Sequence, residues 1–163
     1  MKRYVWSAWV FLILLQIWQS VPAQTNQELE SALRRLAASL RMKTRMVQMK
    51  EPMMYFGFRN PGVVNDSLEQ EIEKKFILKF AAIVVCDIHE DEVIKRRFDQ
   101  YTFSDNQIPP DELLSLLNDP EKFPYIIYGT ISRNEKDGRI DLKAFIYHSP
   151  NNKHYMSVNA RLP

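Results

Sequence analysis

The chain has 163 residues and carries 22 Lys and Arg against 20 Asp and Glu. Residues 1–23 contain two basic residues and no acidic one, so the part that follows has no net charge, which argues against general binding to nucleic acid. The 140 residues after residue 23 are enough for one hydrophobic core, which predicts a single domain. Cys86 is the only cysteine, so no internal disulfide can form.

Residues 1–23 are typical of a secretory signal. Lys2 and Arg3 precede an apolar stretch over residues 4–17, and the segment closes on Val21-Pro22-Ala23. The stretch is shorter than the roughly twenty apolar residues that span a bilayer. We expect export through a bacterial inner membrane with cleavage after Ala23, and a retained membrane anchor is the alternative. Lipid attachment at the cleavage point is excluded, because the residue after Ala23 is Gln24 and not a cysteine.

Residues 25–50 predict an amphipathic helix. Thr25 and Glu28 have the spacing of a capping box, and no Gly or Pro follows until Pro52. An apolar stripe runs along the whole helix: Leu29, Leu33, Leu36 and Leu40 recur every three or four positions, after which the stripe rotates to Met42, Met46 and Met49. We treat residues 24–51 as a unit apart from the domain at residues 52–163.

The same helix is the only strongly basic region, and it supplies the first candidate binding surface. Its candidate contact residues are Arg34, Arg35, Arg41 and Arg45. Such a helix can dock on an acidic protein or lie on an anionic membrane surface. In the alternative interpretation, the leucines pack on the chain's own domain and the arginines are solvated.

A βαβ unit is predicted after Pro52. Residues 53–58 are short and aromatic and end at a Pro-Gly turn, which indicates a strand. Asn65 or Asp66 can cap a following helix with an apolar residue at every fourth position. Residues 81–88 form a continuous apolar run, which predicts a strand buried on both faces and parallel to the first. Cys86 lies in this run and is interpreted as a small buried apolar residue.

Two further helices and a meander complete the predicted fold. Residues 90–101 predict a helix, and Pro109-Pro110-Asp111 starts a short leucine-rich one. Residues 125–132, 139–148 and 154–161 predict an antiparallel meander. The fold class is therefore α/β with a mixed sheet, helices packed on it and an N-terminal amphipathic helix before it.

The middle strand of the meander supplies a second candidate binding surface. Ile140, Leu142, Ala144 and Ile146 alternate with a half-polar set, which predicts one buried face and one outer face. The aromatic residues assigned to the outer face, as anchors for a partner, are Phe145, Tyr147 and Tyr155.

Three local sequences carry a resemblance to a known family. They are Met54-Tyr55-Phe56-Gly57-Phe58-Arg59-Asn60, residues 82–87, and Phe123-Pro124-Tyr125-Ile126-Ile127-Tyr128-Gly129-Thr130-Ile131-Ser132. With the order of elements, they resemble the domain shared by the TolB N-terminal region, the CsgG-type secretion protein and the LpoB-type activators of peptidoglycan synthases, over about residues 53–160. Gly129 would allow close backbone approach. The chain departs from the family at the turn His148-Ser149-Pro150-Asn151-Asn152 and in lacking the lipid-bearing cysteine that many members have.

Candidate chemistry is sparse. His89 precedes Glu90, Asp91 and Glu92, which suits either a metal or acid/base cluster or the acidic start of a helix. His148 and His154 flank a turn, but two imidazoles are half of a tetrahedral zinc site. Nucleotide-binding and hydrolase motifs are absent. We predict no catalytic residue, cofactor or metal, with a small hydrolase at His89 as the alternative.

The resemblance and the signal together imply a function. The chain is expected to be a non-enzymatic accessory protein of the cell envelope, periplasmic or associated with the outer membrane, that binds other envelope proteins and no nucleic acid. A peripheral protein that lies on an anionic membrane surface through residues 25–50 is the alternative.

Overall fold

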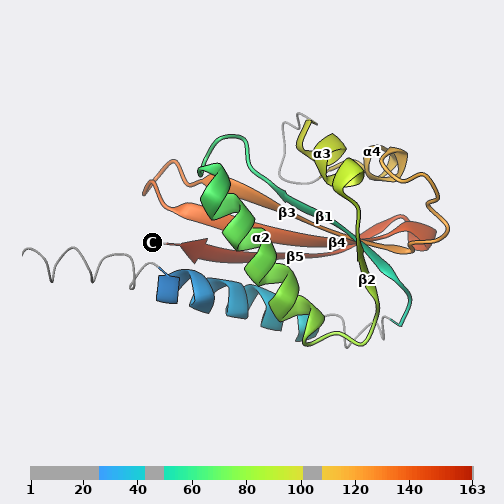
Figure 1. Ribbon diagram of the computed structural model, residues 1–163, viewed down its shortest axis with the longest axis horizontal. Helices are drawn as coiled ribbons and strands as arrows, with labels where there is room; N and C mark the ends of the chain where they lie inside the picture. Colours follow the sequence, from blue (N-terminus) through green and yellow to red (C-terminus); the bar gives the residue numbers. More distant parts are fainter. Residues whose placement is uncertain (1–25, 43–49, 101–107, 163) are drawn as a thin grey trace, which may run out of the picture.

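The computed structural model describes residues 26–42, 50–100 and 108–162, without the side chains of residues 155–158. These residues form a five-stranded sheet with the strand order β2-β1-β3-β4-β5 and helices on both faces (Figure 1). The predicted signal segment and its cleavage point lie outside the described residues. In the described part of the chain, no helix has the length and apolar character needed to cross a membrane.

The predicted βαβ unit is confirmed. β1 (Met53–Arg59) and β2 (Ile88–Glu90) are parallel, with Met53 paired to Ile88, and α2 (Asp66–Ala81) connects them. Asn65 caps α2, because its side chain accepts a hydrogen bond from the Leu68 N–H at 2.9 Å. The helix then buries an apolar residue at every fourth position, Ile72, Phe76 and Phe80, against the sheet.

The prediction of a strand at residues 81–88 is wrong. α2 extends to Ala81, the next residues form a turn, and the strand that follows has three residues at the edge of the sheet. Val85, in the middle of the run, is 94% exposed. A short apolar run does not distinguish the end of a buried helix from a buried strand. The central strand that is buried on both faces is β3 (Tyr125–Arg133).

The predicted meander is confirmed. β3 pairs antiparallel with β4 (Ile140–His148), and β4 pairs antiparallel with β5 (Lys153–Leu162) after the 3₁₀ turn η1 (Ser149–Asn151). The β1–β3 pairing is parallel, so the sheet is mixed. α3 (Glu92–Gln100) and α4 (Pro110–Ser115) correspond to the two helices predicted at residues 90–101 and after Pro109.

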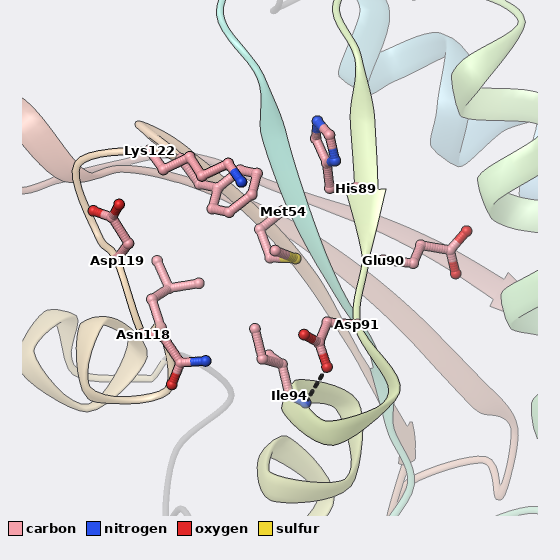
Figure 2. A pocket seen from close by; sticks show the side chains of 10 residues that line it. Met54, His89, Glu90, Asp91, Ile94, Asn118, Asp119 and Lys122 are labelled. Atoms are coloured by element: carbon pink, nitrogen blue, oxygen red, sulfur yellow. Dashed lines mark hydrogen bonds between the residues drawn. The ribbon is translucent and has the colours of Figure 1, made fainter.

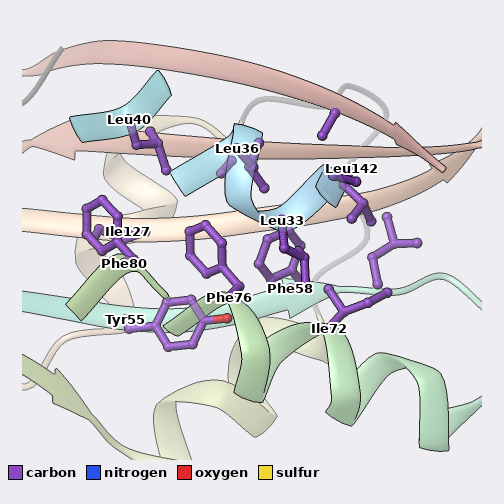
Figure 3. Packing of buried hydrophobic residues seen from close by; sticks show 14 of the residues in the cluster. Leu33, Leu36, Leu40, Tyr55, Phe58, Ile72, Phe76, Phe80, Ile127 and Leu142 are labelled. Atoms are coloured by element: carbon purple, nitrogen blue, oxygen red, sulfur yellow. The ribbon is translucent and has the colours of Figure 1, made fainter. Parts of the chain in front are cut away.

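The N-terminal helix at residues 26–42 packs into the same core as α2. Leu33, Leu36 and Leu40 are 0% exposed and lie against the phenylalanines of α2 and the sheet (Figure 3). Glu30 joins this helix to α2 through ion pairs with Lys75, at 3.0 Å, and Lys79. The interpretation in which the leucines pack on the chain's own domain is therefore the one that the structure shows. We call this side of the sheet the first face.

The other side, the second face, is covered by α3 and α4. Its core includes Phe56, Phe98, Ile126, Tyr128 and Tyr147. Phe98 contacts Phe56 with a ring separation of 5.6 Å and Tyr128 with one of 5.8 Å, so one side chain of α3 packs on both β1 and β3.

Two glycines allow β1 and β3 to pack as they do. The register of β1 shifts between Tyr55 and Phe58, where Gly57 has φ +92°, and the freed Phe58 N–H donates to Glu73 Oε1 at 2.6 Å. A Cβ on Gly129 would lie 2.3 Å from the Phe58 ring. Gly129 therefore has a close-packing role, as the sequence predicts, but the group that approaches it is the Phe58 ring and not a backbone.

Candidate functional site

The aromatic candidates do not form an exposed surface. Phe145 is 4% exposed and stacks on Tyr128 at 4.8 Å, and Tyr147 is 0% exposed and donates its hydroxyl hydrogen bond to Asn152 Oδ1 at 3.0 Å. The prediction that these two residues lie on an open outer face is wrong, because both belong to the core that α3 and α4 cover. The side chain of Tyr155 lies outside the described part of the chain.

The basic candidates differ in exposure. Arg34 and Arg35 are exposed on the side of the N-terminal helix that faces away from the core, and Arg35 Nε donates to the Ser31 carbonyl at 3.4 Å. Arg41 is half-buried, and Arg45 lies outside the described residues. The exposed charge of the described helix is therefore concentrated at Arg34 and Arg35.

The two histidines of the β4–β5 connection lie on opposite faces of the sheet. His148 stacks on Tyr125 at 4.6 Å on the first face. His154 is paired with Tyr147 and lies 3.1 Å from the Tyr128 hydroxyl on the second face. Successive residues of a strand point to opposite faces, so these imidazoles cannot share a metal ion. Burial lowers the pKa of both histidines.

A pocket of about 290 Å³ opens on the second face, and His89 lies at its edge (Figure 2). Its polar lining comes from the end of β2 and from the segment between α4 and β3: His89, Glu90, Asp91, Asn118, Asp119 and Lys122. Its apolar lining is Met54, Ile94, Leu117 and Phe123, all residues of the second core. The pocket is thus where that core reaches the surface.

Internal contacts already occupy part of the polar lining. Asp91 Oδ1 accepts hydrogen bonds from the N–H groups of Val93 and Ile94, at 2.8 and 3.2 Å, and so caps α3. Glu90 pairs with Lys95 at 2.5 Å, and its side chain points away from the hollow in Figure 2. His89 packs against the edge of Phe123 with ring centroids 5.1 Å apart. These contacts fit the interpretation as the acidic start of a helix for Asp91 and Glu92, whereas Glu90 is the last residue of β2.

Within the described ranges, no three His, Cys, Asp or Glu side chains come together in a way that could hold a metal ion. The sequence drew attention to His89 and the acidic residues after it. It did not indicate Asn118, Asp119 or Lys122, and it singled out Phe123 only as part of the family resemblance; these residues complete the pocket from the other side. The only sequence signal for that segment is a polar stretch with a proline between a short helix and a strand.

A second group of carboxylates lies near β1, between α2 and α3. Burial raises the pKa of Glu73, against the effect of its hydrogen bond from Phe58. Burial, together with the nearby charge of Glu69, raises the pKa of Asp99 to about 6. The folded protein therefore holds protons here at a pH where an unfolded chain would release them.

The fold is similar to that of LpoB C-terminal domains, which confirms the predicted resemblance at the level of fold. The LpoB C-terminal domain from Salmonella enterica matches with a TM-score of 0.53 and 12% identity over 82% of this chain and 96% of that domain. The corresponding Escherichia coli domain matches with a TM-score of 0.50 and 10% identity over 81% and 98%. No protein-family model matches the chain, and neither does any curated protein sequence.

Proposed function

We propose that this chain is a non-enzymatic, exported accessory protein of the cell envelope that binds another protein through the exposed basic side of its N-terminal helix. The observation that carries the proposal is the contrast within this helix. Leu33, Leu36 and Leu40 are fully buried, whereas Arg34 and Arg35 are exposed. The helix therefore offers a partner charge and hydrogen-bond donors, while its leucines stabilise the fold.

This contrast favours an acidic protein over a lipid surface. A helix that lies in a membrane interface inserts its apolar side between the lipids. Here the leucine stripe is occupied by the phenylalanines of α2 and by the sheet. Insertion would require this core to open. The fold shared with LpoB C-terminal domains supports the envelope setting, since the sequence resemblance points to the same group of proteins.

The proposal is tested by crosslinking in the native cell and copurification with the full chain. Reversing Arg34 and Arg35 to Glu should lower partner recovery at low salt, because exposed charges mainly accelerate encounter. The matched control reverses Lys136 and Arg139, two exposed cations of the β3–β4 turn, and should leave recovery unchanged. Equal recovery with both variants would contradict the docking surface.

The membrane alternative and the export step have their own measurements. Binding to phosphatidylglycerol vesicles but not to phosphatidylcholine vesicles, with loss on reversal of Arg34 and Arg35, would support the membrane alternative instead. Mass spectrometry of the exported protein should show a chain that begins at Gln24. An exported protein that still carries residues 1–23 would contradict cleavage.

A further inference from the structure

The pocket on the second face combines an apolar floor with an acidic rim. The floor residues Met54, Ile94, Leu117 and Phe123 are largely buried and reach the hollow with only part of their surface. The charged residues that line it are two carboxylates, Asp91 and Asp119, and one lysine, Lys122, because Glu90 is paired with Lys95 and points away from the hollow. A ligand that complements this site has an apolar part and a positive charge.

One carboxylate of the rim is held in place. Asp91 is fixed by two hydrogen bonds from the start of α3, and both end on Oδ1. Among the described residues, Oδ2 takes part in neither bond, so it can accept from a ligand without a change of side-chain conformation. These bonds also occupy the N–H groups that would otherwise attract an anion to the start of α3.

We propose that this pocket binds an arginine side chain presented by a partner protein, with the aliphatic stem on the apolar floor and the guanidinium at Asp91. The inference rests on the proposed function, because it adds a second contact to the same protein-binding module. Arginine fits better than lysine for two reasons. Its planar guanidinium matches a carboxylate, and it stacks on an aromatic ring such as that of Phe123. The volume of about 290 Å³ is large enough for one arginine side chain.

Lys122 gives the inference a sharp test. It lies across the hollow from Asp91 in Figure 2, with its Nζ 5.4 Å from the centre of the Phe123 ring. A cationic ligand competes with Lys122 for this ring and is repelled by its charge. An anionic ligand would instead use Lys122 as its partner. Removing the lysine charge therefore changes affinity in opposite directions for the two kinds of ligand.

The experiment titrates N-acetyl-arginine methylamide into the ¹⁵N-labelled full chain and follows the backbone amide shifts. The uncharged isostere N-acetyl-citrulline methylamide is the ligand control. We expect shifts in residues 89–95 and 117–123. We also expect the citrulline probe to bind about tenfold more weakly than the arginine probe, since one charge-assisted hydrogen bond accounts for about that factor. Equal binding of both probes, or the absence of shifts in these segments, would overturn the inference.

Three variants assign the effect to the pocket. Asp91→Asn should weaken the arginine probe about tenfold, and because Asn caps a helix as well as Asp does, α3 should stay intact. Lys122→Gln should tighten binding about two- to threefold, as expected for one exposed charge. Asp66→Asn changes an equally charged residue at the start of α2 and should have no effect. Weaker binding by Lys122→Gln would overturn the inference.

The outcome is separable from that of the proposed function. If reversal of Arg34 and Arg35 abolishes partner recovery but the arginine probe does not bind, only the pocket assignment fails. If the probe binds as expected but no protein is recovered by crosslinking, the proposed function fails.

Discussion

The two faces of the sheet are covered by helices of different length. The longer helices of the first face stabilise the fold, whereas the shorter helices of the second face leave room for a binding pocket. On the first face the N-terminal helix and the 16-residue α2 bury a continuous set of leucines and phenylalanines. On the second face α3 has nine residues and α4 has six, so much of the cover comes from connecting segments. The pocket lies between the start of α3 and the segment that follows α4. The helices of the first face cover its core completely, whereas those of the second face leave the second core partly open.

The largest expected effect is on the first face. Removing residues 1–52 exposes the α2 and sheet surface that Leu29, Leu33, Leu36 and Leu40 cover. At roughly 2 kcal/mol for each buried leucine, the loss is on the order of 8 kcal/mol, which is comparable to the whole stability of a small domain. We therefore expect a chain that starts at Met53 to be unfolded by circular dichroism.

The sequence alone predicts the opposite, namely that residues 53–163 fold without this helix. The matched control is a chain that starts at Gln24, which retains the helix and should unfold cooperatively. Cooperative urea unfolding of the shorter chain would show that the sheet folds without the leucine stripe. In that case the division at residue 52 would be a true domain boundary.

A smaller effect is expected at the contact between β1 and β3. Gly129→Ala places a methyl group 2.3 Å from the Phe58 ring, and overpacking of this kind costs about 1–3 kcal/mol. The measurement is urea unfolding of the single variants and of Gly129→Ala combined with Phe58→Leu. The two changes should be less than additive, because the smaller side chain at residue 58 relieves the clash. Additive losses would show that the ring is not what excludes a side chain at residue 129.

The smallest expected effect is a pH dependence that arises from Asp99, near β1 between α2 and α3. The pKa of Asp99 is raised to about 6 in the folded protein, so the contribution of this group to stability is greatest below its unfolded pKa of about 3.9 and is lost as the pH rises through about 6. Asp99→Asn should therefore be more stable than the natural chain at pH 7, and this gain should shrink towards pH 4. The carboxyl group of Asp99 is partly desolvated, but the residue as a whole is exposed, so solvent screening keeps the gain under about 1 kcal/mol.

The measurement is urea unfolding between pH 4 and pH 8. Asp66→Asn serves as the control, because this exposed aspartate lies in the first turn of α2, where its charge favours the helix. It should give no gain at pH 7. A gain of equal size in both variants would mean that general charge reduction, and not the environment of Asp99, produces the effect.

Local patterns were enough to predict most elements of the fold. The fourfold spacing from Leu68 to Phe80 and the cap at Asn65 indicated α2, and the alternation in residues 139–148 indicated β4 within an antiparallel meander. The run at residues 81–88 was wrongly predicted as a strand. Several of its apolar residues pack beside the first core, and in the sequence such a run has the same pattern as a buried strand. The aromatic pair Phe145 and Tyr147 was placed on an outer face for a related reason. Alternation shows that a strand has two different sides, but it does not show that helices cover both.

The candidate site divides in the same way. The sequence by itself determined that the N-terminal helix is amphipathic and basic, that the acidic residues after His89 suit the start of a helix and that Gly129 permits close approach, because each of these depends on neighbours within a few residues. Only the tertiary structure decided that the leucine stripe closes the first core and that residues 117–123 meet residues 89–95 around a pocket. Both depend on contacts between segments far apart in the chain, and these contacts form when the sheet brings together surfaces that no local pattern records.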